Sequence, residues 1–195
     1  MTGSRRHRPA CEEDQQAWRA TALLYNHLTR GGCPQPYRPA DALVLAEGES
    51  CYADTVLGYA RYYGIDPAVA PAPALMVGPA GLIATSLVVS AWHTRRARRR
   101  AHARAKPAWR DTHPARTVLT DQRTLCNPGD GAWIDLSHDQ LLGLHAWPDD
   151  HALVATYTHT APLRLTGPWT PWYALTWAAL VYPRDRLLPE FAHLA

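Results

Sequence analysis

The chain of 195 residues contains few of the patterns that accompany catalysis or metal binding. Its four cysteines lie far apart, and no CxxC or Cys/His ligand spacing occurs, so neither a zinc site nor a disulfide framework is indicated. The ten histidines form no HExxH or His-x-His motif, and no glycine-rich phosphate loop is present. The sequence therefore predicts a protein that is not an enzyme and that needs no metal or cofactor.

One local sequence still invites a catalytic interpretation, because Ser137, His138 and Asp139 are adjacent. A catalytic triad needs side chains that converge in space, whereas neighbours on a strand point to opposite faces. The densest group of histidines, between residues 138 and 159, follows the turns of an expected strand series, and we interpret its members as surface residues. Neither group changes the prediction of a non-catalytic protein.

The amino terminus lacks the pattern of a secretory signal. The sequence MTGSRRHRPACEEDQQ is positively charged, but no apolar stretch follows it. We therefore expect a reducing cytoplasm in which the cysteines remain thiols, with peripheral association at the inner membrane face left open.

Charge is distributed unevenly along the chain, and this is its most informative feature. Residues 67–92 carry no charge, whereas residues 93–110 carry eight cations and no anion. Outside that run the chain has 12 basic and 17 acidic residues, although its formal net charge is +3. The cationic character is local, which indicates a dedicated patch that contacts a polyanion, either a lipid headgroup surface or nucleic acid.

Two segments before the middle of the chain have helical character. Residues 12–30 begin with three acids, which suit the positive end of a helix dipole, and are followed by Gly31 and Gly32. Residues 80–105 contain no proline and are rich in Ala, Leu and Arg, which predicts a helix of about 26 residues. The first half of that helix is apolar and its second half is basic.

The remaining segments predict strands and one closing helix. Residues 41–63 are interpreted as two strands separated by a turn at Gly48. After Pro107, short segments bounded by Pro, Gly, Asp and Asn predict an antiparallel meander of about four or five strands. A final helix follows, for which Thr170 is a good N-cap and Pro171 suits the first helical position.

Four short stretches carry a resemblance to a fold family: Leu45–Glu49 (LAEGE), Val118–Leu125 (VLTDQRTL), Trp133–Leu136 (WIDL) and Leu163–Trp172 (LRLTGPWTPW). Over residues 41–182 the chain resembles the PH-like (GRAM-like) domains of bacterial proteins, and also a group of actinobacterial proteins of unassigned function. The resemblance implies an α+β fold in which an antiparallel PH-like sheet or barrel is closed by the carboxy-terminal helix. Such domains share shape more than ligand, so the resemblance assigns no function.

The expected organisation follows from these elements. Residues 1–36 form a tail and the amino-terminal helix, residues 37–183 form the PH-like domain, and residues 184–195 form a second tail. The long helix, at about 79–106, is an insertion between strands and departs from the plain PH pattern.

The expected function is binding. We expect a non-enzymatic module that contacts an anionic membrane surface, or a protein partner, through the apolar-then-basic helix. The candidate contact residues are its cations Arg95, Arg96, Arg98, Arg99, Arg100, Arg104 and Lys106. Like charges four residues apart destabilise a helix by roughly 0.2–0.5 kcal/mol per pair, and an anionic partner would relieve this repulsion.

Three alternatives remain open. The arginines at 95–104 would also suit a nucleic-acid-associated protein, although only Trp92 and Trp109 supply aromatic rings nearby. Residues 74–92 have nearly the length of one membrane span, but small residues and proline dilute their hydrophobicity. An exposed apolar helix at 82–92 would also favour homo-oligomers.

Overall fold

The computed structural model describes residues 12–38, 43, 45–64, 106–129, 131–183 and 191. The chain divides into two units, a larger one formed by Met1–Arg61 with Asp111–Ala195, and a smaller one formed by Tyr62–Arg110. The helix expected at 80–105 and the candidate span at 74–92 lie outside the described residues.

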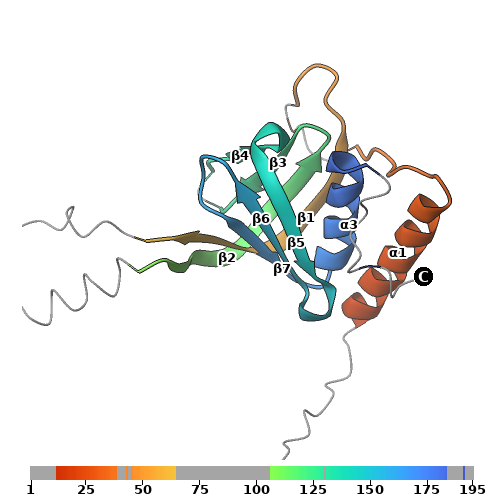
Figure 1. Cartoon of the computed structure of the whole chain (residues 1–195), viewed down its shortest axis with the longest axis horizontal. Helices are drawn as coiled ribbons and strands as arrows, with labels where there is room; N and C mark the ends of the chain where they lie inside the picture. Colours follow the sequence, from red (N-terminus) through yellow and green to blue (C-terminus); the bar gives the residue numbers. More distant parts are fainter. Residues whose placement is uncertain are drawn as a thin grey trace, which may run out of the picture. The chain divides into compact units, whose positions relative to one another are not determined.

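Seven strands form one antiparallel sheet in the order β4-β3-β2-β1-β7-β6-β5. The strands are β1 (Cys51–Tyr63), β2 (Ala108–Thr120), β3 (Arg123–Asn127), β4 (Ile134–Ser137), β5 (Leu141–Trp147), β6 (Ala152–Tyr157) and β7 (Leu163–Thr166). Consecutive strands are neighbours within β1–β4 and within β5–β7, and the pairing of β1 with β7 joins the two groups (Figure 1).

The α+β class and the antiparallel sheet are confirmed. Of the predicted sheet or barrel the structure has an open sheet, because β4 and β5 are its two edges and do not pair with each other. Two details of the prediction are wrong. Residues 51–63 form one long strand, whereas 45–50 form a turn in place of the expected first strand. Six strands follow Pro107, where four or five were expected, because short turns divide the meander more finely.

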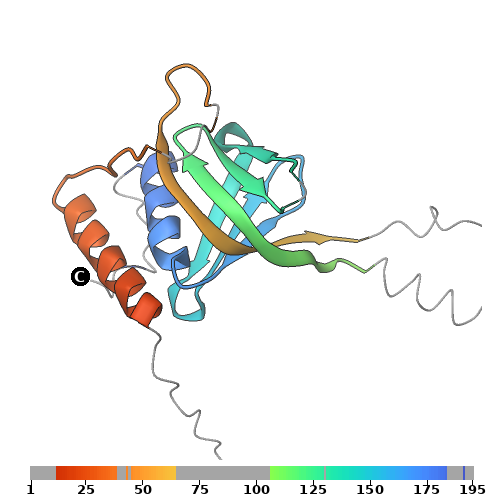
Figure 2. The same cartoon turned by 180° about the vertical axis from the view of Figure 1, so that it is seen from behind.

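Two α-helices of the described ranges accompany the sheet. α3 (Thr170–Val181) packs against β5 and β6, and α1 (Glu12–Thr29) lies along the other side of α3 (Figures 1 and 2). The predicted amino-terminal helix is thus confirmed, and it turns a face with buried Ala17, Thr21 and Leu28 inward. It ends at Thr29, and Gly31, just beyond that end, has a φ of 93°, a left-handed conformation that glycine adopts without strain.

The start of α3 differs from the sequence-based prediction by one residue. Trp169 occupies the N-cap position, Thr170 is the first helical residue, and no side chain caps the helix. The Thr170 side chain is buried, and its hydroxyl has no hydrogen-bond partner among the described residues. Pro171 lies in the first turn, where its missing N–H costs no hydrogen bond.

The main core lies between the sheet and α3. Its largest fully buried side chains include Trp177 and Tyr173 from α3 and Leu119, Leu153 and Leu165 from the sheet. A smaller cluster of Cys51, Val118 and Leu125 packs with Leu43 and Leu45. Because Leu119 and Val118 are neighbours on β2, the smaller cluster lies on the opposite face of the sheet.

A buried carboxylate fastens the 45–50 turn to the hairpin between β2 and β3. The Glu49 side chain is 0% exposed and accepts hydrogen bonds from Arg123 Nε (2.8 Å) and Nη2 (2.8 Å). It also accepts from the Thr120 hydroxyl (2.7 Å) and the Ala46 amide (2.7 Å). Arg123 in turn donates to Asp135 on β4 (2.5 Å). We refer to Glu49, Thr120, Arg123 and Asp135 as the clasp.

The clasp explains three of the four stretches that carry the family resemblance. Glu49 belongs to LAEGE, Thr120 and Arg123 to VLTDQRTL, and Asp135 to WIDL. Glu49 and Arg123 are 74 positions apart and form a partly buried ion pair, which Asp135 extends at the surface, so these residues hold the stretches together. Burial alone would raise the pKa of Glu49, but Arg123 and the other donors lower it to about 2.

We expect Glu49→Gln to lower the free energy of unfolding by about 3 kcal/mol at pH 7, because it removes the buried carboxylate of the Arg123 ion pair and leaves only the exposed Asp135 as an ionic partner. The folded-state pKa is depressed, so the stabilisation is present above the unfolded pKa of about 4.5 and is lost as pH falls toward 2. Urea unfolding across this pH range should therefore show the gap between wild type and variant closing.

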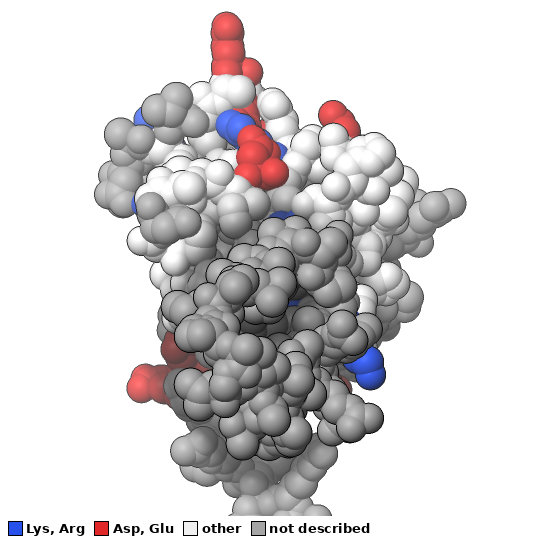
Figure 3. All heavy atoms as spheres, turned by 90° about the vertical axis from the view of Figure 1, so that its left-hand side faces the viewer, with Lys and Arg blue, Asp and Glu red and all other residues white. Residues whose placement is uncertain are grey.

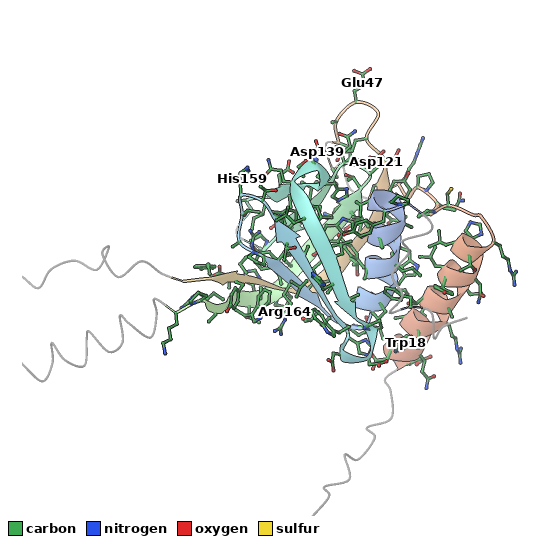
Figure 4. All side chains as sticks on the ribbon, in the orientation of Figure 1. Trp18, Glu47, Asp121, Asp139, His159 and Arg164 are labelled. Carbon is green, nitrogen blue, oxygen red and sulfur yellow. The ribbon has the colours of Figure 1, made fainter. Side chains whose placement is uncertain are left out.

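The matched control is Glu47→Gln, two residues away in the same turn. Glu47 projects from the tip of this turn, away from the sheet (Figure 4), and its replacement should change stability by no more than about 0.5 kcal/mol. Equal losses for the two variants would contradict a structural role for the clasp.

A glycine lies at the seam between the two strand groups. Gly58 on β1 faces Thr166 on β7, and a Cβ at this position would overlap the Thr166 hydroxyl and approach the Thr166 carbonyl oxygen to 3.3 Å. We expect Gly58→Ala to destabilise the fold by about 1–3 kcal/mol in urea unfolding. Gly143→Ala is the control, since its nearest neighbour would be at 3.6 Å. An unchanged free energy of unfolding for Gly58→Ala would show that β1 and β7 are loosely packed at this position.

Candidate functional site

The cations predicted from the sequence are only partly described by the structure. Arg95, Arg96, Arg98, Arg99, Arg100 and Arg104 lie outside the described residues, whereas Lys106 is described and exposed. Residues 65–105 connect β1 to β2, which are neighbours in the sheet. The apolar-then-basic sequence is therefore inserted between two hydrogen-bonded strands.

The strand ends that flank this insertion belong to the smaller unit and combine cations with aromatic rings. The Tyr62 and Trp109 rings are 5.2 Å apart, and the Arg110 guanidinium lies 5.8 Å from the centre of the Tyr63 ring. Arg110 also donates to the Tyr63 carbonyl (3.0 Å) and to the Lys106 carbonyl (3.4 Å). Tyr62 is 41% exposed. We call these five residues the strand-end set.

The charge of the larger unit is opposite in sign to that of the inserted sequence. Its described residues include twelve acids and seven arginines. On the face shown in Figure 3, acidic side chains are exposed at several separate places. The described residues of the larger unit thus carry an excess of acids, and the densest basic run of the sequence is the one between β1 and β2.

An arginine that the sequence analysis did not single out lies inside the larger unit. Arg61 on β1 is 7% exposed, and its Nη2 donates to the Thr160 hydroxyl in the turn between β6 and β7 (2.5 Å). Its Nε has no hydrogen-bond partner among the described residues. Alternation on β1 places Arg61 on the same face as Leu57 and Tyr59, which is the core face.

Polar side chains of the core surround this arginine. Burial raises the pKa values of Tyr59, Cys126 and Tyr157, and the nearby charge of Arg61 opposes the rise in each case. The Tyr157 hydroxyl has no hydrogen-bond partner among the described residues. The described groups near Arg61 are therefore neutral hydroxyls and a thiol, and none of them carries a negative charge at pH 7.

An open cavity of about 420 Å³ adjoins these residues. It is lined by Tyr59, Asp111, His113, Pro128 and Ile134. The Tyr59 and His113 rings are stacked, with centres 5.1 Å apart. Asp111 has a φ of 55°, so the chain is locally irregular where β2 borders the cavity.

A second cavity, of about 260 Å³, is lined mainly by the aromatic rings of Tyr37, Tyr52, Trp169 and Trp172. The Asp54 carboxylate in its wall accepts two hydrogen bonds from Arg116 (2.9 and 2.7 Å). Because that charge is already compensated, this cavity offers stacking surface and no uncompensated ion.

The adjacent Ser137, His138 and Asp139 do not form a triad. The Ser137 hydroxyl accepts from the Asp139 amide (3.3 Å), whereas His138 Nε2 lies 3.4 Å from the Thr124 hydroxyl. Burial lowers the pKa of His138 to about 4, so the ring is neutral at pH 7. His138 is half-buried beside Trp177, so its interpretation as a surface residue is wrong.

A signal for Arg61 was present in the sequence. In LGYARYY the residues at 57, 59 and 61 alternate with smaller or exposed ones, so a strand places all three on one face. An arginine in register with core positions is the unusual feature. The Tyr157 and Thr160 partners had no such signal, because only the folded sheet brings β6 and its turn to β1.

Comparison of the chain with known protein families and with curated proteins finds no match. Among the described residues, neither helix is long and apolar enough to cross a membrane.

The described thiols should differ sharply in reactivity. Burial raises the pKa of Cys51 to about 11 and that of Cys126 to about 12, whereas Cys33 is exposed. With iodoacetamide at pH 8, peptide mass spectrometry should detect fast alkylation of Cys33 and slow alkylation of the other two until the protein is unfolded. Rapid native labelling of Cys51 or Cys126 would contradict the described packing.

Proposed function

We propose that this chain is a non-enzymatic binding module that contacts an anionic membrane surface through residues 67–110. The observation that carries the proposal is the charge pattern, in which an uncharged stretch of 26 residues precedes eight cations without an anion. Such a pair suits a membrane interface, where apolar side chains enter the acyl boundary and cations contact headgroups.

The strand-end set supports this proposal. Tyr and Trp rings are favoured at membrane interfaces because they have an apolar body and a polar tip, and Lys and Arg contact the headgroups there. The set brings Tyr62 and Trp109 together with Arg110 and Lys106 where the inserted sequence leaves and re-enters the sheet.

The larger unit acts, in this proposal, as the PH-like scaffold that holds the insertion. Support comes from the order of the elements, in which seven antiparallel strands are followed by a helix that packs on the sheet. The excess of acids among its described residues would keep the scaffold itself off an anionic surface, so that binding is confined to the insertion.

The test is co-sedimentation of the full chain with phosphatidylglycerol-containing and neutral phosphatidylcholine vesicles across a salt series. We expect binding to anionic vesicles with a fraction that resists salt, because apolar insertion is not screened. Arg98→Glu/Arg99→Glu should weaken this binding at least about 30-fold, since each cation near such a surface contributes about 1 kcal/mol.

Arg19→Glu/Arg30→Glu is the matched control, because it changes the net charge equally at two exposed positions of the larger unit. It should leave vesicle binding nearly unchanged. Equal weakening by both pairs would show unspecific attraction and contradict the proposal. Binding to duplex DNA with a steep loss in salt, and none to vesicles, would favour the nucleic-acid alternative instead.

A further inference from the structure

The buried guanidinium of Arg61 has no compensating charge among the described residues. No described acid lies within ion-pair distance of it, and its partners there are neutral hydroxyls, Thr160 at 2.5 Å and the adjacent Tyr59. Arginine keeps its proton at any physiological pH, so it cannot avoid the cost of burial by becoming neutral. Buried charges in proteins are normally paired, whereas the described part of the chain supplies no ionic partner to this one.

The other buried ion of the larger unit, the Glu49 carboxylate, is fully compensated by the chain. The Glu49 carboxylate accepts hydrogen bonds from four donors, two of them on a guanidinium, and every one of these is supplied by the chain. Arg61 has a donor left over at Nε, and the neighbouring Tyr157 hydroxyl is also without a partner. The missing component at this place is an acceptor that carries negative charge.

We propose that Arg61 forms an internal binding site for the oxyanion group, carboxylate or phosphate, of a small molecule. Two oxygens of such a group match the fork of N–H donors on a guanidinium. Tyr157 and Thr160 supply hydroxyls beside it, from the end of β6 and the turn before β7. Figure 4 shows His159, the neighbour of Thr160, at the tip of that turn.

The adjoining cavity limits the size and the charge of the ligand that carries the oxyanion group. Tyr59 lines the cavity and also senses the charge of Arg61, so Tyr59 is the residue that connects the cavity with the surroundings of the guanidinium. The Asp111 carboxylate in the same wall disfavours a second negative group. We therefore expect a small monovalent acid or phosphate ester in preference to a polyanion, which separates this site from the basic run at 93–110.

The first measurement uses the full chain without lipid. Its thermal unfolding midpoint is followed with increasing inorganic phosphate, acetate or succinate, with sodium chloride keeping the ionic strength constant. We expect phosphate or acetate to raise the midpoint saturably, by about 5–10 °C at 100 times the Kd, with succinate weaker than acetate. Whichever of phosphate and acetate raises the unfolding midpoint at the lower concentration identifies the preferred oxyanion group.

Two variants locate the effect. Arg61→Gln should weaken the preferred anion by at least about tenfold, and Tyr157→Phe should weaken it less. Arg38→Gln, at an exposed position, is the control and should bind as wild type does. Equal stabilisation of wild type and Arg61→Gln would overturn the proposal.

A second readout follows the wild-type chain and needs a folded variant only to assign the signal. In a ¹⁵N-labelled sample, the arginine Nε–Hε signal of a buried guanidinium is protected from exchange and is assigned to Arg61 by its loss in Arg61→Lys. Saturable movement of this signal with phosphate or acetate, at one site per chain, would support the proposal. An unmoved signal with all three anions, in a folded sample, would overturn it.

Discussion

The pairing of β1 with β7 is the constraint on which the rest of the structure depends. β1 lies in the middle of the sheet, between the strand that follows it and the last strand of the chain. The two groups of strands are joined only through β1, and its partner residues on β7 are about a hundred positions away, as with Arg61 and Leu163. A contact of such sequence separation forms only when the whole larger unit is assembled.

Several other features follow from this placement. Gly58 is needed where β1 passes close to Thr166. The core face of β1 is covered by α3 residues near the carboxy-terminal end of the sequence. The long insertion at 65–105 leaves the sheet between two neighbouring strands, so the scaffold can carry it without interrupting any strand pair. The insertion with its basic run can therefore vary without changing any strand pair of the sheet.

The two buried ions illustrate different uses of the same chemistry. At Glu49 the chain supplies every partner, and the result is a clasp that holds the 45–50 turn on the β2–β3 hairpin. At Arg61 the described residues supply only neutral hydroxyl partners and leave Nε without one. A satisfied buried ion rigidifies a structure, whereas an unsatisfied one is costly, and this cost is what the proposed oxyanion ligand would offset.

The sequence by itself determined the elements that local chemistry specifies. These are the α+β class, the helix from Glu12, the antiparallel strands after Pro107 and the helix that ends before Pro183, because periodicity, acids in a first turn and Pro or Gly breaks act over a few residues. It also determined the separation of the apolar and basic stretches. It misplaced the N-cap of α3 and read the 45–50 turn as a strand, because Trp169 and Glu49 owe their positions to partners elsewhere.

Only the tertiary structure decided which distant residues meet. The clasp unites three stretches of the chain, and Arg61 meets Thr160 across 99 positions, which no local pattern encodes. The open edge of the sheet and the direction of the Arg61 side chain into the core likewise depend on which strand β1 pairs with. Burial and ion pairing are properties of that assembly, since they depend on every group packed around a charge and not on its neighbours in sequence.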